Sequence, residues 1–321
     1  MHPVQTDRNT GRALGPDTMI EFSPRYRDPL HVPVVSDDYI RRYAETLVGD
    51  FKPELLRVPQ KINALRFIEN YLGAQVEYHT LYNQDKNKGI CGLTLFDWDT
   101  ITVMEPEKRV ILVGPDTIVI NVPLQAGSVY DRLVQSYTDP TFRTSELFTQ
   151  LHEAGHYCMH RPVYTAGRAA PCPAKEHNPV PRLAGGHDYG TVKSAAAGTA
   201  ESPATARGGN DRIAPEAAAA ARAVRTCEHQ ANVFAAAAAM PRQTFIPFAV
   251  EAIREAGFQN GVFIMPDAFN EPENGPELWE ADLLLQSVCG KIGDVFGVSM
   301  PTAEIHLRTL GLLRDIGKRR G

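Results

Sequence analysis

The stretch SELFTQLHEAGHYCMH, residues 145–160, decides the fold of this chain. From Thr144 its apolar side chains recur with the period of a helix, whereas the preceding third of the chain contains runs typical of strands. The Arg161-Pro162 pair favours a helix end just beyond the stretch, because a residue that precedes proline avoids the helical region. Residues 145–160 therefore predict a single helix.

Inside this helix, His152, Glu153 and His156 form an H-E-x-x-H pattern. Residues four apart lie roughly 40° apart around a helix and about 6 Å along it, so both imidazoles can reach one zinc ion. Glu153 lies next to the first ligand, where it can accept a proton from water that the metal activates. The pattern predicts one zinc ion per chain, held by His152 and His156, with Glu153 as general base.

The same pattern also fits a surface helix with two solvated histidines. The neighbouring side chains argue against that alternative, because they are apolar and indicate a helix that is buried on much of its surface: Phe148, Leu151, Ala154 and Tyr157. Two histidines and a glutamate in such surroundings are costly unless something binds them.

A catalytic zinc site needs a third protein ligand and an open position for water. His160 is one alternative, but on an unbroken helix it lies about 12 Å along the axis from His152, out of reach. Glu228 is the better candidate, because it lies in an Ala-rich helix predicted for residues 216–240, and small side chains allow close packing against the first helix. His229 is expected on the surface of that helix.

The remaining segments predict an α+β fold. Helices are expected at residues 39–51, behind an N-cap at Ser36, and at residues 61–73, which end on Gly73, as well as at 245–257, 276–297 and 302–311. Five runs rich in β-branched residues predict strands at 75–82, 92–96, 100–104, 109–113 and 117–123. Residues 1–34 are polar and contain several prolines, so we expect them to be extended or disordered.

A flexible insertion is expected at residues 162–213. No Val, Leu, Ile, Met or aromatic residue occurs between Val192 and Ile213, so this stretch buries too little apolar surface to offset the entropy of ordering. We therefore expect a disordered segment at 1–34, a metallopeptidase domain at 35–275 that carries the insertion, and a helical element at 276–321.

The composition excludes several classes of protein. A net charge of −5 over 321 residues indicates neither nucleic acid nor a membrane surface as the main partner. No apolar run approaches the roughly 20 residues of a spanning helix, and the N-terminus has no signal-peptide pattern. The five cysteines are scattered and odd in number, which favours reduced thiols and a cytoplasmic location.

Three segments resemble the ImmA/IrrE family of metallo-endopeptidases: FTQLHEAGHYCMH (148–160), EHQANVFAAAAAMP (228–241) and FGVSMPTAEIHLRTLGLL (296–313). The resemblance covers roughly residues 60–312 without the insertion. It implies a zincin-like α+β domain, His152, His156 and Glu228 as ligands, and Glu153 as catalytic acid/base. It also implies a protein substrate inside the cell, such as a helix-turn-helix repressor.

The chain departs from the family pattern in two places. The spacing from His156 to Glu228 is longer than usual, which the insertion explains, and the alanines at 236–239 replace bulkier residues.

Two other functions compete with an endopeptidase. Residues 296–313 could form a helix-turn-helix of a DNA-binding regulator with a structural zinc site, but the second helix offers only His306 and Arg308 as base or phosphate contacts. A non-catalytic zinc scaffold is disfavoured, because a closed structural site has no need of Glu153.

Overall fold

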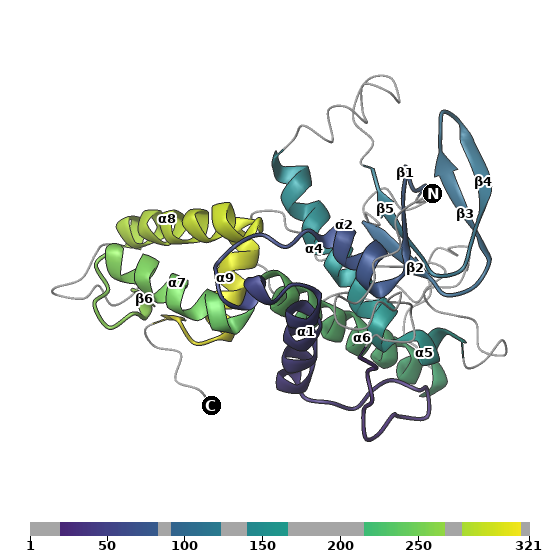
Figure 1. The fold of residues 1–321 in the computed structure, drawn as a ribbon, viewed down its shortest axis with the longest axis horizontal. Coiled ribbons are helices and arrows are strands. Elements are labelled where there is room, and N and C mark those ends of the chain that lie inside the picture. Colours follow the sequence, from purple (N-terminus) through teal and green to yellow (C-terminus); the bar gives the residue numbers. More distant parts are fainter. Residues whose placement is uncertain (1–19, 83–90, 123–139, 166–214, 267–277, 316–321) are drawn as a thin grey trace, which may run out of the picture.

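The computed structural model describes residues 20–82, 91–122, 140–165, 215–266 and 278–315. Helices and strands are mixed within these ranges, so the expected α+β class is confirmed. Figure 1 shows the strands of residues 75–121 at one end of the molecule and the helices of residues 242–309 at the other, with the helices of residues 37–51, 140–159 and 215–239 between them. The predicted insertion lies outside the described residues, except for the short helix α5 (Arg161–Thr165) at its start.

The strands form a small sheet and a hairpin. In the sheet, β5 (Thr117–Asn121) lies between β1 (Gln75–His79), to which it is parallel, and β2 (Gly92–Leu95), to which it is antiparallel. The hairpin pairs β3 (Asp99–Met104) with β4 (Lys108–Val113). All five strands fall in the predicted runs, except that β3 and β4 each begin one residue earlier. A small apolar cluster packs the hairpin on the sheet: Leu81, Ile101, Val103, Val113 and Val119.

The expected helices are present, with the caps that the sequence predicted. Helix α1 (Asp37–Phe51) begins where the Ser36 hydroxyl accepts a hydrogen bond from the backbone N–H of Tyr39. Helix α2 (Ala64–Arg66) continues into a π-helical turn that ends at Gly73, whose φ of 77° only glycine adopts readily.

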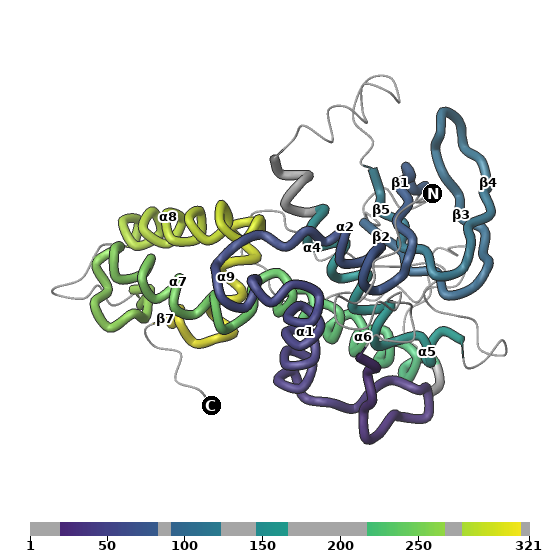
Figure 2. Tube along the Cα trace, viewed as in Figure 1, coloured from purple at the N-terminus to yellow at the C-terminus, as the bar shows by residue number. Residues whose placement is uncertain are grey.

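Two long helices form the centre of the molecule. Helix α4 (Pro140–Met159) contains the H-E-x-x-H pattern and starts earlier than residue 145, where the sequence placed it. It packs against α6 (Pro215–Ala239), which in turn packs against α1. The trace in Figure 2 shows α1 beside α6, although about half of the chain separates them in sequence.

The segment before α1 belongs to the core at two points. Residues 20–34 have the extended course that the sequence indicated, and an isolated bridge pairs Arg27 with Pro33. Phe22 and Val32 are nevertheless buried, at 5% and 2% exposure. The disorder expected for residues 1–34 therefore does not extend to residues 20–34, because apolar side chains anchor them; residues 1–19 lie outside the described ranges.

The C-terminal helices share the core of the rest of the chain. Helices α7 (Arg242–Glu255), α8 (Leu278–Phe296) and α9 (Met300–Thr309) contribute Phe245, Phe296 and Leu307 to the same buried cluster as α4 and α6. Strand β7 (Leu313–Asp315) pairs in parallel with β6 (Phe263–Met265), a contact that the sequence analysis missed. The core therefore continues across the boundary expected at residue 275.

Among the described residues, no single helix has the length and apolar character needed to cross a membrane. Two helix pairs, α6 with α7 and α8 with α9, meet that requirement only when they are combined across bends of 72° and 102°.

Candidate metal centre

The helix α4 brings His152 and His156 together as its period predicts. Their Nε2 atoms lie 3.1 Å apart, and the side chains are buried, with residue exposures of 8% and 3%. Burial follows from the apolar neighbours on the helix, such as Leu151 and Ala154, which are fully covered. Two imidazoles therefore face each other inside the protein, and the solvated surface helix considered above is wrong.

Glu228 completes a group of three. Its Oε2 lies 3.2 Å from His152 Nε2, and its Oε1 lies 3.4 Å from His156 Nε2. One ligand atom from each residue lies within 4.8 Å of the others, and no further group of this kind occurs in the described part of the chain. Atoms that bind one zinc ion at about 2.0–2.2 Å with tetrahedral angles are separated by roughly 3.3–3.5 Å. The spacing and the donor set of two imidazoles and a carboxylate both fit zinc.

The close approach of α4 and α6 places Glu228. A Cβ atom on Gly155 would lie 3.1 Å from Phe234 Cβ and 3.2 Å from Ala231 Cα, so the absence of a side chain at Gly155 lets α4 approach α6 at these two residues. The alanines at 236–239 belong to the same helix, and Ala237 is fully buried. Small residues therefore let the carboxylate on one helix reach the two imidazoles on the other.

Mutual charge compensation stabilises the three buried side chains of the candidate metal centre. Burial acts to raise the pKa of Glu228, but the facing charge and hydrogen bonds of His156 and His152 outweigh it and lower that pKa. Burial likewise acts to lower the pKa of His152, but the hydrogen bond and charge of Glu228 outweigh it and raise the pKa to about 9. The three groups would be expensive to bury singly.

Glu153 is buried beside the ligands at 2% exposure. The hydroxyl of Thr94 on β2 donates a hydrogen bond of 2.7 Å to Oε2 of Glu153. Burial raises the pKa of the Glu153 carboxyl group. A Cβ atom at Gly92 would lie 2.8 Å from both Cγ and Oε1 of Glu153. The sheet therefore fixes the carboxylate, and a glycine makes room for it.

The sequence analysis did not identify the residues that hydrogen-bond to His152 and Glu153 and hold their side chains in place. Asn232 Oδ1 lies 2.9 Å from His152 Nδ1, so the amide oxygen accepts the Nδ1 proton and leaves Nε2 for a metal. Asn232 follows Glu228 by four residues, and this helical spacing was the available signal. Thr94 carried no comparable signal, because its contact depends on how β2 meets α4.

The other histidines take different places. His160 is not one of the three ligands, as the helical distance predicted, but it is fully buried behind His156. Burial is the main cause that lowers its pKa well below the usual value. His229 is exposed and pairs with Asp37 at 2.8 Å, as expected for a surface residue.

The side chains considered for DNA contact are engaged within the fold. His306 is 3% exposed and packs edge-on against the Phe245 ring, with centroids 4.5 Å apart. Arg308 donates to Glu304 at 3.1 Å and to Asp315 at 2.8 Å. Neither side chain is presented as a DNA contact.

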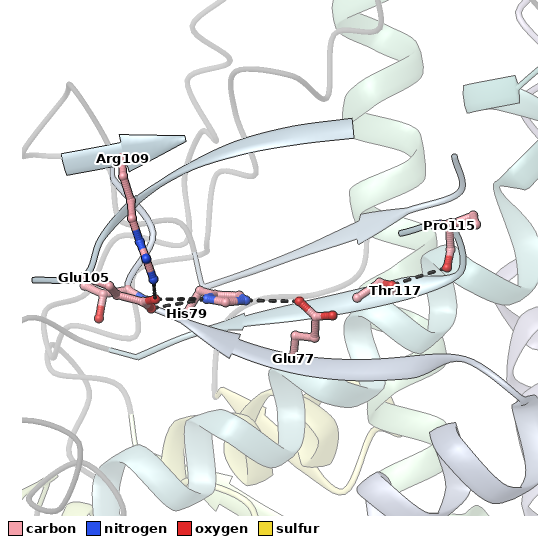
Figure 3. Close-up of polar contacts among 7 residues, drawn as sticks. Glu77, His79, Glu105, Arg109, Pro115 and Thr117 are labelled. Carbon is pink, nitrogen blue, oxygen red and sulfur yellow. Dashed lines mark hydrogen bonds and ion pairs between the residues drawn. The ribbon is translucent and has the colours of Figure 1, made fainter. Parts of the chain in front are cut away.

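A second group of acidic and basic side chains lies on the sheet. Figure 3 shows His79 between Glu77 and Glu105, with Arg109 paired to the same carboxylate of Glu105. Glu77 lies 3.1 Å from Nε2 of His79, and Glu105 lies 3.3 Å from Nδ1. The carboxylates therefore occupy opposite nitrogens of one ring, an arrangement that cannot close around a single ion.

No family model matches the chain, and no curated protein or solved structure matches it either. The candidate metal centre therefore stands on its residues and their geometry.

Proposed function

We propose that this chain is a zinc-dependent endopeptidase with a zincin-like site. His152, His156 and Glu228 hold one zinc ion, and Glu153 is the general base. The observation that carries the proposal is the convergence of three buried ligand atoms within 4.8 Å of one another, with a buried carboxylate on the residue next to the first ligand. A structural site explains the three ligands but gives no reason to bury Glu153 beside them.

The residues of the chain divide the reaction between them. Zinc, when bound, supplies a Lewis acid that polarises the peptide carbonyl and activates water. Glu153 takes the proton of the attacking water and passes it to the leaving amine nitrogen. Thr94 holds the carboxylate through Oε2, so the general base is in place before substrate binds. Asn232 keeps His152 in the tautomer that binds a metal through Nε2.

We propose that an extended peptide substrate binds along β2. Strand β2 is the last in the order β1-β5-β2 of the described residues, and it contacts α4. Thr94 connects β2 directly to Glu153. A peptide that added alongside this strand would run past the general base, a recurring way in which proteins bind extended chains. This geometry favours a polypeptide substrate over a small molecule.

The natural substrate that we propose is an intracellular protein such as a helix-turn-helix repressor. Support comes from the resemblance of residues 148–160, 228–241 and 296–313 to ImmA/IrrE endopeptidases. Helices α8 and α9 are bent by 102° at the break between them, an angle typical of a helix-turn-helix. Because His306 and Arg308 are engaged internally, we assign this unit to the core and to protein contact rather than to DNA.

A matched pair of variants tests the reaction. The purified protein with zinc is incubated with candidate repressors, and discrete cuts are detected by mass spectrometry. Glu153→Gln should keep the zinc and the fold but lose cleavage, because an amide cannot accept the proton of water. Glu146→Gln, the same change on the same helix at a residue bonded to Tyr78, should cleave normally. Cleavage retained by Glu153→Gln would remove Glu153 from the mechanism.

A further inference from the structure

A buried hydrogen-bond chain leads away from the metal centre. His160 Nδ1 lies 3.0 Å from His156 Nδ1, and His160 Nε2 lies 2.9 Å from Gln230 Oε1. The Gln230 amide nitrogen lies 2.7 Å from the carbonyl oxygen of Pro33. His160 and Gln230 are 0% and 3% exposed. These hydrogen bonds thus connect His156 on α4 to Gln230 on α6, and Gln230 to the backbone of the segment before α1.

The carbonyl oxygen of Pro33, at the end of this series, determines which atom donates in each hydrogen bond. A carbonyl oxygen only accepts, so Gln230 must turn its NH₂ group towards Pro33. Its Oε1 then faces His160 and can only accept, so His160 must carry its proton on Nε2. The neutral ring therefore has a bare Nδ1, and that atom accepts the proton that His156 carries on Nδ1. His156 is left with Nε2 facing Glu228 and His152.

We infer that His160 and Gln230 are positioning residues, which hold His156 in the tautomer that presents a bare Nε2 to the metal. This inference rests on the metal site of the proposed function but not on proteolysis. The two ligand histidines are then held in different ways. Asn232 acts on His152 directly, whereas His156 is held through a chain of two side chains that ends on backbone.

The backbone anchor explains why this arrangement is fixed. If the Gln230 amide turned over, its oxygen would face the carbonyl oxygen of Pro33, and two buried acceptors would lose a donor. If His160 carried its proton on Nδ1 instead, its bare Nε2 would face Oε1 of Gln230, and two acceptors would again meet without a donor. Either reversal leaves buried polar atoms unsatisfied. The hydrogen-bond directions given above satisfy every buried polar atom in this series.

The tautomers can be read directly by long-range ¹H–¹⁵N NMR on protein labelled with ¹⁵N-histidine, both metal-free and with zinc. The inference predicts a proton on Nδ1 of His156, and on His160 a proton on Nε2 with a bare Nδ1. His160 protonated on Nδ1 in both states would overturn it. Because the metal-free protein gives the same readout, this test decides the matter even if the protein binds no zinc, a result that would overturn only the proposed function.

Zinc affinity, measured by competition with a chelator, gives the second test. Gln230→Met removes both of its hydrogen bonds at nearly constant volume, and Gln230 touches neither the ligands' Nε2 atoms nor Glu228 in the described contacts. The loss expected is roughly 10- to 100-fold, as for other residues that orient metal ligands. The matched control is Gln150→Met. Gln150 is also a buried glutamine, but it lies on α4 and bonds to Tyr78 and Glu146.

A comparison of substitutions at position 160 separates positioning from packing. His160→Leu fills the space without an acceptor, whereas His160→Asn restores an oxygen close to the place of Nδ1. Zinc affinity should fall in the first and recover in part in the second. Equal affinities for wild type, Gln230→Met and His160→Leu, with normal zinc binding by wild type, would show that these residues only fill the core.

Discussion

Two regions of the molecule each combine histidine with carboxylate side chains, and they differ in geometry. At the metal centre, His152, His156 and Glu228 turn their ligand atoms towards one point. On the sheet, His79 lies between Glu77 and Glu105, each on a different ring nitrogen (Figure 3). The ligand atoms of the first group converge on one point, whereas the two carboxylates of the second group lie on opposite sides of the His79 ring.

Backbone period and burial account for the difference. Residues four apart on α4 lie on one face of a helix, so both Nε2 atoms point the same way. Glu77 and His79 lie two apart on β1 and share a face of the strand, but side by side along it. The His79 side chain is 19% exposed and that of Glu77 is 39% exposed, so water reaches the second cluster. Composition alone therefore does not identify a metal site.

The largest effect should separate the two clusters by their zinc content. Glu228→Ala removes one of the three proposed ligands and should lower zinc affinity sharply, because two imidazoles alone are fewer than the three protein ligands that a catalytic zinc site needs. Glu105→Ala should leave the zinc content at about one ion per chain. Atomic absorption on the purified variants measures both. Zinc lost from Glu105→Ala and retained by Glu228→Ala would reverse the assignment.

His306 is a buried histidine that has no carboxylate partner among the described residues. Its burial should make the stability of the protein depend on pH. Burial, helped by Arg41 and Arg242, lowers the pKa of His306 to about 4 from 6.5. As pH falls through this window, the unfolded chain takes up a proton that the folded chain refuses, so stability falls as pH falls. The loss is at most about 3 kcal/mol by pH 4.

Urea unfolding of metal-free protein at several pH values measures this effect. His306→Phe keeps the ring packing against Phe245 and should reduce the acid-dependent loss between pH 6.5 and 4 by the share that His306 contributes. His229→Ala, a change at an exposed histidine, should keep it. The same pH dependence in wild type and His306→Phe would contradict the explanation.

A glycine pair tests the close packing that makes the metal centre converge. Gly155→Ala inserts a methyl group between α4 and α6, where its Cβ would lie 3.1 Å from Phe234 Cβ. It should cost about 1–3 kcal/mol of unfolding free energy and weaken zinc binding, because Glu228 moves with α6. Gly290→Ala meets no atom within 4 Å and should stabilise α8 by about 0.5–1 kcal/mol. Equal stability of both variants would disprove the tight contact.

The smallest effect belongs to the cluster on the sheet. Burial acts to raise the pKa of Glu105, but the backbone N–H of Thr80 and the contact with His79 outweigh it and lower that pKa. Its stabilising effect is therefore present at neutral pH and disappears as the carboxylate is protonated in acid. Glu105→Gln should cost less than about 1 kcal/mol at pH 7, because solvent screens such pairs. Thermal unfolding at pH 7 and pH 3 checks this.

Local patterns in the sequence predicted most of the fold. The helices, the five strands of the sheet and hairpin, and the caps at Ser36 and Gly73 were all visible, because each depends on residues close together in the chain. The pairing of β6 with β7 was missed, since both strands are three residues long and each is defined only by the other.

The pattern His152-Glu153-x-x-His156 determined by itself that two imidazoles share a helical face, because helix geometry fixes that spacing. Whether the face is buried, and which carboxylate completes it, depended on how α4 packs on α6 through Gly155. The same packing made His160 a buried partner of His156, whereas contacts of α9 with α7 and β7 engage His306 and Arg308. Contacts between distant segments decide such roles, and local sequence does not encode them.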